Sequence, residues 1–337
     1  MRPPDAATKT VRLYGEELQR SYGGFVRRSL FVIIPRVPLL LTPPMGIFVK
    51  RIAAVLSCLC LLSSPFTAQG ADWEGPQAPF ALYGTSYYVG TQGLSAVLVT
   101  SPAGHILIDG AGPKTPLQIA ANIRQLGFKP EDIKYILVSH EHLDHAGGIA
   151  ELQRLSGATV LTSPAAKPVL ESGVADEGDP QFGNGMPDMT PVAQVNTVRD
   201  GETVTLGPLA IKAHFTPGHT QGGISWTWQA TENGQTMNMV YADSLTAVAG
   251  PNFRYSGHAL YPQAKRDVER SIALVAALPC DILVTAHPDA IGLLERQAQR
   301  KQPGSAALID RDACRKYAEA GRVRLAQTLA KEAAEMR

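Results

Sequence analysis

The chain has 337 residues, of which 45% are hydrophobic and 18% are charged. This apolar fraction excludes a disordered polypeptide, and 31 glycines and 25 prolines without a repeating pattern exclude a collagen-like architecture. Residues 1–70 contain nine Lys or Arg and three Asp or Glu, whereas residues 71–337 contain 22 basic and 27 acidic residues. Because phosphate contacts require clustered Lys and Arg, this acidic body disfavours a nucleic-acid binder.

A secretory signal peptide is predicted over residues 45–70. Two basic residues, an apolar run at 52–62 and a stretch of small residues before Ala71 have the layout of such a signal. The apolar run is shorter than the roughly 20 residues that span a bilayer. We therefore expect cleavage before Ala71, a periplasmic or secreted protein, and no stable membrane association after cleavage. The alternatives are a retained anchor and a lipoprotein that is cleaved before Cys58.

The rest of the chain is expected to form one domain. Translation is expected to start at Met45, which makes residues 1–44 a mis-assigned or disordered N-terminal extension. No linker, repeat or block of like charge divides residues 71–337. A single domain over that range is therefore the simplest interpretation.

Two of the four cysteines remain after removal of the signal. Cys280 and Cys314 form an even pair in a chain that is expected to enter an oxidising compartment. We predict that they form one disulfide. The alternative is a pair of buried free thiols.

In the first half of this domain, apolar runs predict strands and amphipathic runs predict helices. Strands are expected at 93–100, 105–109, 133–138 and 158–162. Helices are expected at 115–126, 146–155 and 164–172. Residues 173–190 are rich in Gly, Asp and Pro, which is typical of a mobile surface loop.

The second half of the domain has a similar order of strands and helices, and more of its strands are expected to be antiparallel. Strands are expected at 203–206, 209–215, 223–229, 236–241 and 282–285. Helices are expected at 266–278 and 310–334. Asn233 and Gly234 favour a tight turn between two of the strands. The order of elements predicts an α/β fold of the αββα sandwich type, with two packed mixed β-sheets flanked by helices.

Four candidate metal ligands lie directly after the strand at 133–138. Alternate residues at a strand end point the same way, so His140 and His142 can share one metal ion. Asp144 and His145 lie just beyond and can turn toward a second ion. Imidazole and carboxylate groups without thiolate suit zinc among the common metals. The alternative is a polar loop of solvated histidines.

Two further histidines occupy similar positions in the chain. His219 and His287 each follow an apolar strand and lie beside a turn residue. A catalytic zinc takes three protein ligands and a water molecule, so five histidines and one aspartate provide two such sets. The other histidines in the domain, His105, His214 and His258, are expected to be structural.

The chain resembles a metallo-β-lactamase of subclass B3, in which no cysteine binds zinc. The resemblance runs from about Trp73 to the C-terminus. It is carried by the block from His140 to His145 and by the motifs Pro217-Gly-His-Thr220, Tyr241-Ala-Asp-Ser-Leu245 and Thr285-Ala-His-Pro288. The first block alone marks only the wider superfamily of metallo-hydrolases with the αββα fold. The surroundings of both domain cysteines also match the disulfide of this subclass.

The resemblance implies two Zn2+ ions per chain. It assigns the first ion to His140, His142 and His219, and the second ion to Asp144, His145 and His287. Ser244 falls where a sister subclass has a cysteine ligand. The resemblance makes Ser244 and Thr246 pocket residues that hold a substrate carboxylate, directly or through water. Asp243 is interpreted as structural or as a group behind a ligand.

The activity implied is zinc-dependent hydrolysis of the β-lactam amide bond by a metal-bound hydroxide, which confers β-lactam antibiotic resistance. Asp144 is the expected catalytic residue, because it would anchor the second zinc and orient the hydroxide. Small-molecule β-lactams are the expected partners, and the oligomeric state is not predicted. One alternative is another exported metallo-hydrolase of this fold, a lactonase or a thioesterase. A second is a non-catalytic zinc-binding protein.

Overall fold

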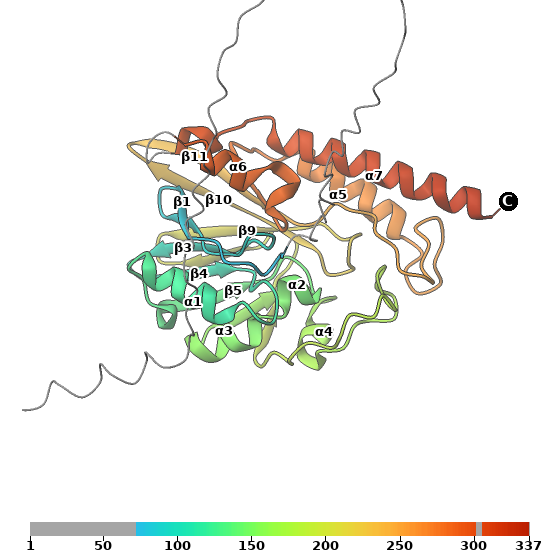
Figure 1. The fold of residues 1–337 in the computed structure, drawn as a ribbon, viewed down its shortest axis with the longest axis horizontal. Coiled ribbons are helices and arrows are strands. Elements are labelled where there is room, and N and C mark those ends of the chain that lie inside the picture. Colours follow the sequence, from blue (N-terminus) through green and yellow to red (C-terminus); the bar gives the residue numbers. More distant parts are fainter. Residues whose placement is uncertain (1–71, 301–304, 337) are drawn as a thin grey trace, which may run out of the picture. The chain divides into compact units, whose positions relative to one another are not determined.

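Two β-sheets packed face to face, with helices on both outer sides, make up the computed structural model of this protein (Figure 1). The structure describes residues 72–300 and 305–336. The predicted αββα sandwich is confirmed. The predicted signal peptide at 45–70 and the N-terminal extension at 1–44 lie outside the described residues.

The first sheet has seven strands, arranged in chain order from β1 to β7. Its strands are β1 Phe80–Tyr83, β2 Ser86–Tyr88, β3 Val97–Ser101, β4 Gly104–Ile108, β5 Ile133–Leu137, β6 Thr159–Thr162 and β7 Val195–Thr197. Strands β1 to β4 are antiparallel, and β4 to β7 are parallel. The carboxyl ends of β4, β5, β6 and β7 therefore lie at one edge of this sheet.

The second sheet has five strands in the order β12-β11-β10-β9-β8. Its strands are β8 Thr203–Leu206, β9 Leu209–Phe215, β10 Ile224–Glu232, β11 Gln235–Ala242 and β12 Ile282–Thr285. Strands β8 to β11 are antiparallel, and β12 runs parallel to β11. The carboxyl ends of β11 and β12 consequently lie side by side.

Alternation along the strands separates the interior into three apolar layers. Successive side chains of a strand point to opposite faces of its sheet. In β3, Val97 and Val99 face the second sheet, whereas Leu98 faces the helices. In β11, Met239 faces the first sheet, and Val240 packs toward the helices on the other side. Strands that are apolar on both faces are thus explained by helices on both outer surfaces.

Seven α-helices lie outside the sheets among the described residues. They are α1 Pro116–Gln125, α2 Leu143–Ala146, α3 Ile149–Ser156, α4 Lys167–Ser172, α5 Ala264–Ala277, α6 Leu293–Ala298 and α7 Ala313–Glu335. In Figure 1, α1 and α3 lie on the outer side of the first sheet, and α5 and α7 lie together beyond the second. No helix in the described part of the chain is long and apolar enough to cross a lipid bilayer.

The helix predicted at 146–155 is confirmed as α3, but its predicted start is wrong, because Ala146 ends the separate helix α2 and α3 begins at Ile149. Gly147 and Gly148 separate the two helices. A Cβ on Gly148 would lie 2.2 Å from the carbonyl oxygen of Gly110, so only glycine allows this close approach. The short turn of α2 carries the predicted ligands Asp144 and His145.

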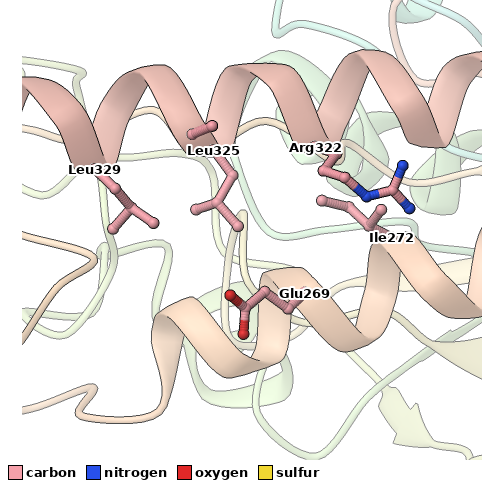
Figure 2. Close-up of a pocket in the computed structure, with 6 residues that line it drawn as sticks. Glu269, Ile272, Arg322, Leu325 and Leu329 are labelled. Carbon is pink, nitrogen blue, oxygen red and sulfur yellow. The ribbon is translucent and has the colours of Figure 1, made fainter.

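The C-terminal helix α7 is joined to the rest of the fold by the predicted disulfide. Cys280 and Cys314 are bonded, with their Cα atoms 6.2 Å apart. The alternative of two free thiols is therefore wrong. Helices α5 and α7 also enclose a shallow pocket, in which Glu269 and Ile272 face Arg322, Leu325 and Leu329 (Figure 2). Its lining includes none of the predicted metal ligands.

Candidate metal centre

The predicted metal ligands come from three connections that leave the carboxyl ends of strands. His140 and His142 follow β5, and Asp144 and His145 lie in α2 immediately afterwards. His219 lies between β9 and β10, and His287 follows β12. In α/β sheets, ligand sites form outside the carboxyl ends of the strands. The predicted metal ligands of this protein lie in that position.

Three histidines form the first group of candidate ligands. The ring centroids of His140, His142 and His219 are 4.9 to 5.0 Å apart, and each pair of rings is close to perpendicular. One nitrogen from each ring lies within 4.8 Å of the others. All three residues are buried. Three imidazoles from two distant segments thus converge on one point.

Acceptors behind the rings decide which nitrogen of each histidine faces that point. The Nδ1 of His140 donates to Oδ1 of Asp243 at 2.8 Å, and the Nδ1 of His219 lies 2.9 Å from the carbonyl oxygen of Thr246. Both residues therefore present Nε2 to the group. His140 Nε2 is buried and has no hydrogen-bond partner among the described residues. An unpartnered buried ring nitrogen is costly unless an ion or water molecule satisfies it.

Asp144, His145 and His287 form the second group. Asp144 Oδ2 lies 3.3 Å from His145 Nε2 and 3.4 Å from His287 Nε2, and the two nitrogens are 3.2 Å apart. Zinc bonds to nitrogen are about 2.0–2.1 Å long, so two ligand atoms of a tetrahedral zinc are about 3.3–3.4 Å apart. The spacing of these three atoms matches that value.

Burial favours the neutral form of two of these imidazoles, His140 and His219. It lowers the pKa of His219 to about 3, with a further contribution from the charge of His142. Burial likewise lowers the pKa of His140 well below its ordinary value. The neutral imidazole is the form that binds metal ions.

Asp144 is held in its charged form. Burial opposes ionisation, but the charge of His145 and hydrogen bonds from His145 and His287 hold the pKa of the Asp144 carboxyl well below its usual range. An ionised carboxylate together with imidazole nitrogens is a donor set that suits zinc.

The two groups differ in their access to solvent. The side chain of His140 is fully buried. In contrast, the side chains of Asp144 and His287 are 25% and 24% exposed. The second group therefore has an open side toward solvent.

Three polar residues near the ligands were not singled out from the sequence. Asp179 accepts a hydrogen bond from His142 Nε2, and Gln181 Nε2 lies 3.3 Å from His219 Nε2. Glu141 is buried and accepts hydrogen bonds from Thr220 Oγ1 and from the Gly222 backbone. Glu141 could have been recognised from the sequence, because it is a charged residue between two candidate ligands, His140 and His142.

The predicted substrate-binding residues lie next to the first group. Ser244 is buried directly after Asp243. The hydroxyl of Thr246 lies 2.9 Å from His219 Nδ1, so this oxygen contacts the ring of a candidate ligand. Asp243 lies behind His140, with its Oδ2 against Gly223, where a Cβ would lie 2.3 Å away. Substrate binding by Ser244 and Thr246 stays a prediction.

Comparison with known proteins gives the same family. A model of the "Metallo-beta-lactamase superfamily" matches residues 89–287. The chain belongs to this superfamily. A crystal structure of MEM-A1, a subclass B3 metallo-beta-lactamase from a soil metagenome library, is 64% identical to this superfamily member, with a TM-score of 0.77. The match covers 78% of this chain and all of the other.

Two further structures agree with this subclass. The metallo-beta-lactamase SMB-1 bound to 2-mercaptoethanesulfonate is 49% identical, with a TM-score of 0.75, over 77% of this chain and 99% of that chain. MIM-1 from Novosphingobium pentaromativorans is 41% identical, with a TM-score of 0.74, over 80% of this chain and 97% of that chain. The resemblance to subclass B3 is thus confirmed.

Curated relatives are more distant. The hydroxyacylglutathione hydrolase of Pseudomonas paraeruginosa is 33% identical over 190 residues, which are 56% of this chain. This metallo-beta-lactamase superfamily member spans only 58% of that relative's length. The N-acyl homoserine lactonase AttM of Agrobacterium fabrum is 34% identical over 105 residues, 24% of this chain and 32% of AttM.

Proposed function

We propose that this protein hydrolyses the amide bond of β-lactams and holds two Zn2+ ions when active. The observation that carries the proposal is a buried group of three histidines beside a second group, Asp144, His145 and His287, that is partly exposed to solvent. A structural zinc site is closed by four protein ligands, whereas a catalytic site keeps a position for water. The open side of the second group favours a catalytic site over a non-catalytic zinc-binding protein.

The residues present fit the first ion. His140, His142 and His219 would hold it, since their nitrogens converge and the buried His140 Nε2 has no hydrogen-bond partner among the described residues. Because the pKa of His219 is about 3, this ring can bind a cation at neutral pH without first releasing a proton. Burial also raises the pKa of Asp243, and a cation at His140 would act in the opposite direction and favour the carboxylate.

The second ion would be held by Asp144, His145 and His287. Their donor atoms already have the spacing of a tetrahedral zinc site. His287 Nδ1 donates to the carbonyl oxygen of Gly93 at 3.1 Å, which directs its Nε2 inward. A donor set that is prepared before binding requires little rearrangement of the protein.

Hydrolysis of a β-lactam forms a bond from a water oxygen to the carbonyl carbon, breaks the bond from carbon to nitrogen, and leaves a proton on the nitrogen. Bound zinc supplies a water of pKa about 7 and polarises the carbonyl oxygen. The Asp144 carboxylate is ionised and partly exposed, so it can accept a hydrogen bond from the attacking water and orient it. No serine or cysteine nucleophile, and hence no acyl-enzyme, is required.

The β-lactam carboxylate is proposed to lie near Ser244 and Thr246. Both residues follow β11, and the Thr246 hydroxyl lies 2.9 Å from Nδ1 of His219. The Thr246 hydroxyl would then have two partners, the substrate carboxylate and the ring of His219. The solved structures of MEM-A1 and SMB-1, both described as metallo-beta-lactamases, support the choice of substrate class.

Asp243 disfavours a thioesterase. A hydrolase that used an aspartate after β11 as a metal ligand would need the carboxylate of Asp243 to face the donor groups. Here the Asp243 carboxylate holds the back of the His140 ring, and its second oxygen lies against Gly223. This position supports the lactam proposal over hydrolysis of a glutathione thioester.

Export to the periplasm or the medium is also proposed. The signal sequence lies outside the described residues, and the disulfide of Cys280 and Cys314 supports an oxidising compartment. Sequencing the N-terminus of the mature protein tests the cleavage. A start at Ala71 is expected, and a mature protein that retains residues before Met45 would contradict it.

Assays with three substrate classes test the function. Purified protein beginning at Ala71 would be assayed with a chromogenic cephalosporin, an acyl-homoserine lactone and an acyl-glutathione thioester, with and without a chelator. We expect lactam hydrolysis that the chelator abolishes and zinc restores. Preference for the lactone or the thioester would reject the proposed substrate class, and absence of all turnover would reject catalysis.

A further inference from the structure

One carboxylate outside the candidate ligand set lies directly behind the metal centre. Asp179 belongs to the 22 residues between α4 and β7, which contain no helix or strand. Its side chain is nevertheless buried, with 6% of the residue exposed. Both of its oxygens lie 3.1 Å from Nε2 of His142. The loop between α4 and β7 therefore reaches a ring that belongs to the first donor group.

This contact gives His142 an orientation that differs from its two neighbours. A carboxylate accepts hydrogen bonds, so His142 Nε2 carries the proton and Nδ1 is left with the lone pair. His140 and His219 are held at Nδ1 and are left with Nε2. Without an acceptor at Nε2, the His142 ring could present either nitrogen to a cation.

The bonds that hold Asp179 belong to the same loop. Asp179 Oδ1 accepts a hydrogen bond from the Gln181 backbone at 2.7 Å, and the Asp179 backbone donates to the carbonyl oxygen of Asp176. The loop is joined to the segment after β11 by a hydrogen bond from Gly250 to Pro180, 2.6 Å long. The position of the carboxylate consequently depends on the conformation of this loop.

We propose that Asp179 is a positioning residue that presents His142 Nδ1 to the first ion, and that it couples the loop conformation to occupancy of that site. The inference rests on the proposed metal binding by His142. If the loop conformation favours binding, then binding favours the loop conformation by the same factor. Groups that orient a ligand typically change metal affinity by about 10–100-fold when they are removed.

Zinc affinity of three variants tests the first half of the proposal. Asp179→Ala removes the acceptor, and Asp179→Asn retains an amide oxygen that can accept from Nε2. Asp188→Asn is the matched control, because Asp188 is an exposed residue of the same loop. Titration against a chromophoric chelator is expected to give one site about 10–100-fold weaker in Asp179→Ala, a smaller loss in Asp179→Asn, and no change in Asp188→Asn.

Spectra of the cobalt-substituted protein provide a readout that a folding defect alone does not mimic. We expect the visible absorption of the first-bound cobalt to change in Asp179→Ala and to recover largely in Asp179→Asn. If Asp179→Ala does not fold, Asp179→Asn alone decides: a loss of zinc affinity of more than twofold is expected, and an affinity within twofold of wild type would overturn the proposal.

Hydrogen exchange tests the coupling. In the wild-type protein, zinc is expected to slow amide exchange of residues 173–194, and this protection should be absent in Asp179→Ala while the remaining protein is protected normally. Equal affinity and equal loop protection in wild type and Asp179→Ala would overturn the inference. A wild-type protein that binds no zinc would instead overturn the proposed function, so the two failures are distinguishable.

Discussion

A histidine can bind a cation through either ring nitrogen, and in this protein the contact behind each ring decides which nitrogen is available. His140 and His219 are held at Nδ1, and His142 is held at Nε2. The three acceptors are a carboxylate, a backbone carbonyl and a second carboxylate. Orientation of the donors is therefore a property of their neighbours rather than of the histidines alone.

Loss of one ligand tests this residue-scale account. His219→Ala should lower bound zinc by about one equivalent and lactam turnover by at least about 100-fold, because a first-group donor is removed. His214→Ala is the control, since His214 lies on β9 and contacts Thr227 rather than the donor groups. Metal analysis and initial rates measure both effects. Wild-type zinc content and turnover in His219→Ala would contradict the assignment.

The candidate metal ligands were predictable from the sequence, whereas the residues that hydrogen-bond to them were not. His140, His142, Asp144 and His145 lie within six residues after an apolar strand, so local sequence carries the signal. Asp179 has no such signal, because its loop has no periodicity and its partner lies 37 positions away. Only the tertiary fold brings that carboxylate to the ring.

Many of the candidate site residues lie just after the ends of strands. Strands β5, β11 and β12 deliver five of the candidate site residues through the connections that follow them, namely His140, His142, Ser244, Thr246 and His287. Their cores are buried on both faces and hold these connections in place. Rigid strands thus position side chains that lie on irregular loops.

The turn between β10 and β11 provides a test of backbone conformation. Asn233 and Gly234 have φ values of 51° and 77°, in the left-handed region that glycine adopts without strain. No atom lies within 4 Å of a Cβ added at Gly234, so Gly234→Ala should lower the free energy of unfolding by about 1 kcal/mol through backbone strain alone.

Gly257→Ala is the matched control, because a Cβ there also meets no atom and its φ is not positive. Its stability in urea denaturation should stay within about 0.5 kcal/mol of wild type. Equal destabilisation by both substitutions would show that the turn conformation is not the cause.

The disulfide is expected to stabilise the attachment of α7. Cys280 and Cys314 are 34 positions apart, and closing a loop of that length stabilises a fold by about 3–4 kcal/mol in the chain-entropy description. The double variant Cys280→Ala/Cys314→Ala should lose about 2–4 kcal/mol in denaturant unfolding and still bind zinc. A loss of zinc without a loss of stability would contradict this role.

Element boundaries were predictable where the sequence pattern itself changes at both ends of the element. Strands β8, β9 and β12 begin and end at the predicted residues. The helix predicted at 146–155 begins three residues later than expected, because Gly147 and Gly148 allow the chain to approach residues 110–113, a contact that periodicity does not reveal. Strands β1, β2 and β7 are short, of three or four residues, and were not predicted.

At the scale of the whole molecule, two sheets bring residues from His140 to His287 to one edge of the sandwich. Each donor group combines residues from distant parts of the chain, so neither group exists without the complete fold. Zinc should therefore stabilise the folded state by mass action, about 2.7 kcal/mol for a free zinc concentration 100 times the Kd.

Lactam hydrolysis is expected to depend on the metal ions that these two donor groups hold. Zinc should be added stepwise to metal-free protein while hydrolysis of a penicillin, a cephalosporin and a carbapenem is followed. We expect no turnover without metal, an increase for at least one substrate as zinc is bound, and a plateau at two equivalents. A protein that binds two equivalents of zinc and leaves all three lactams intact would contradict it.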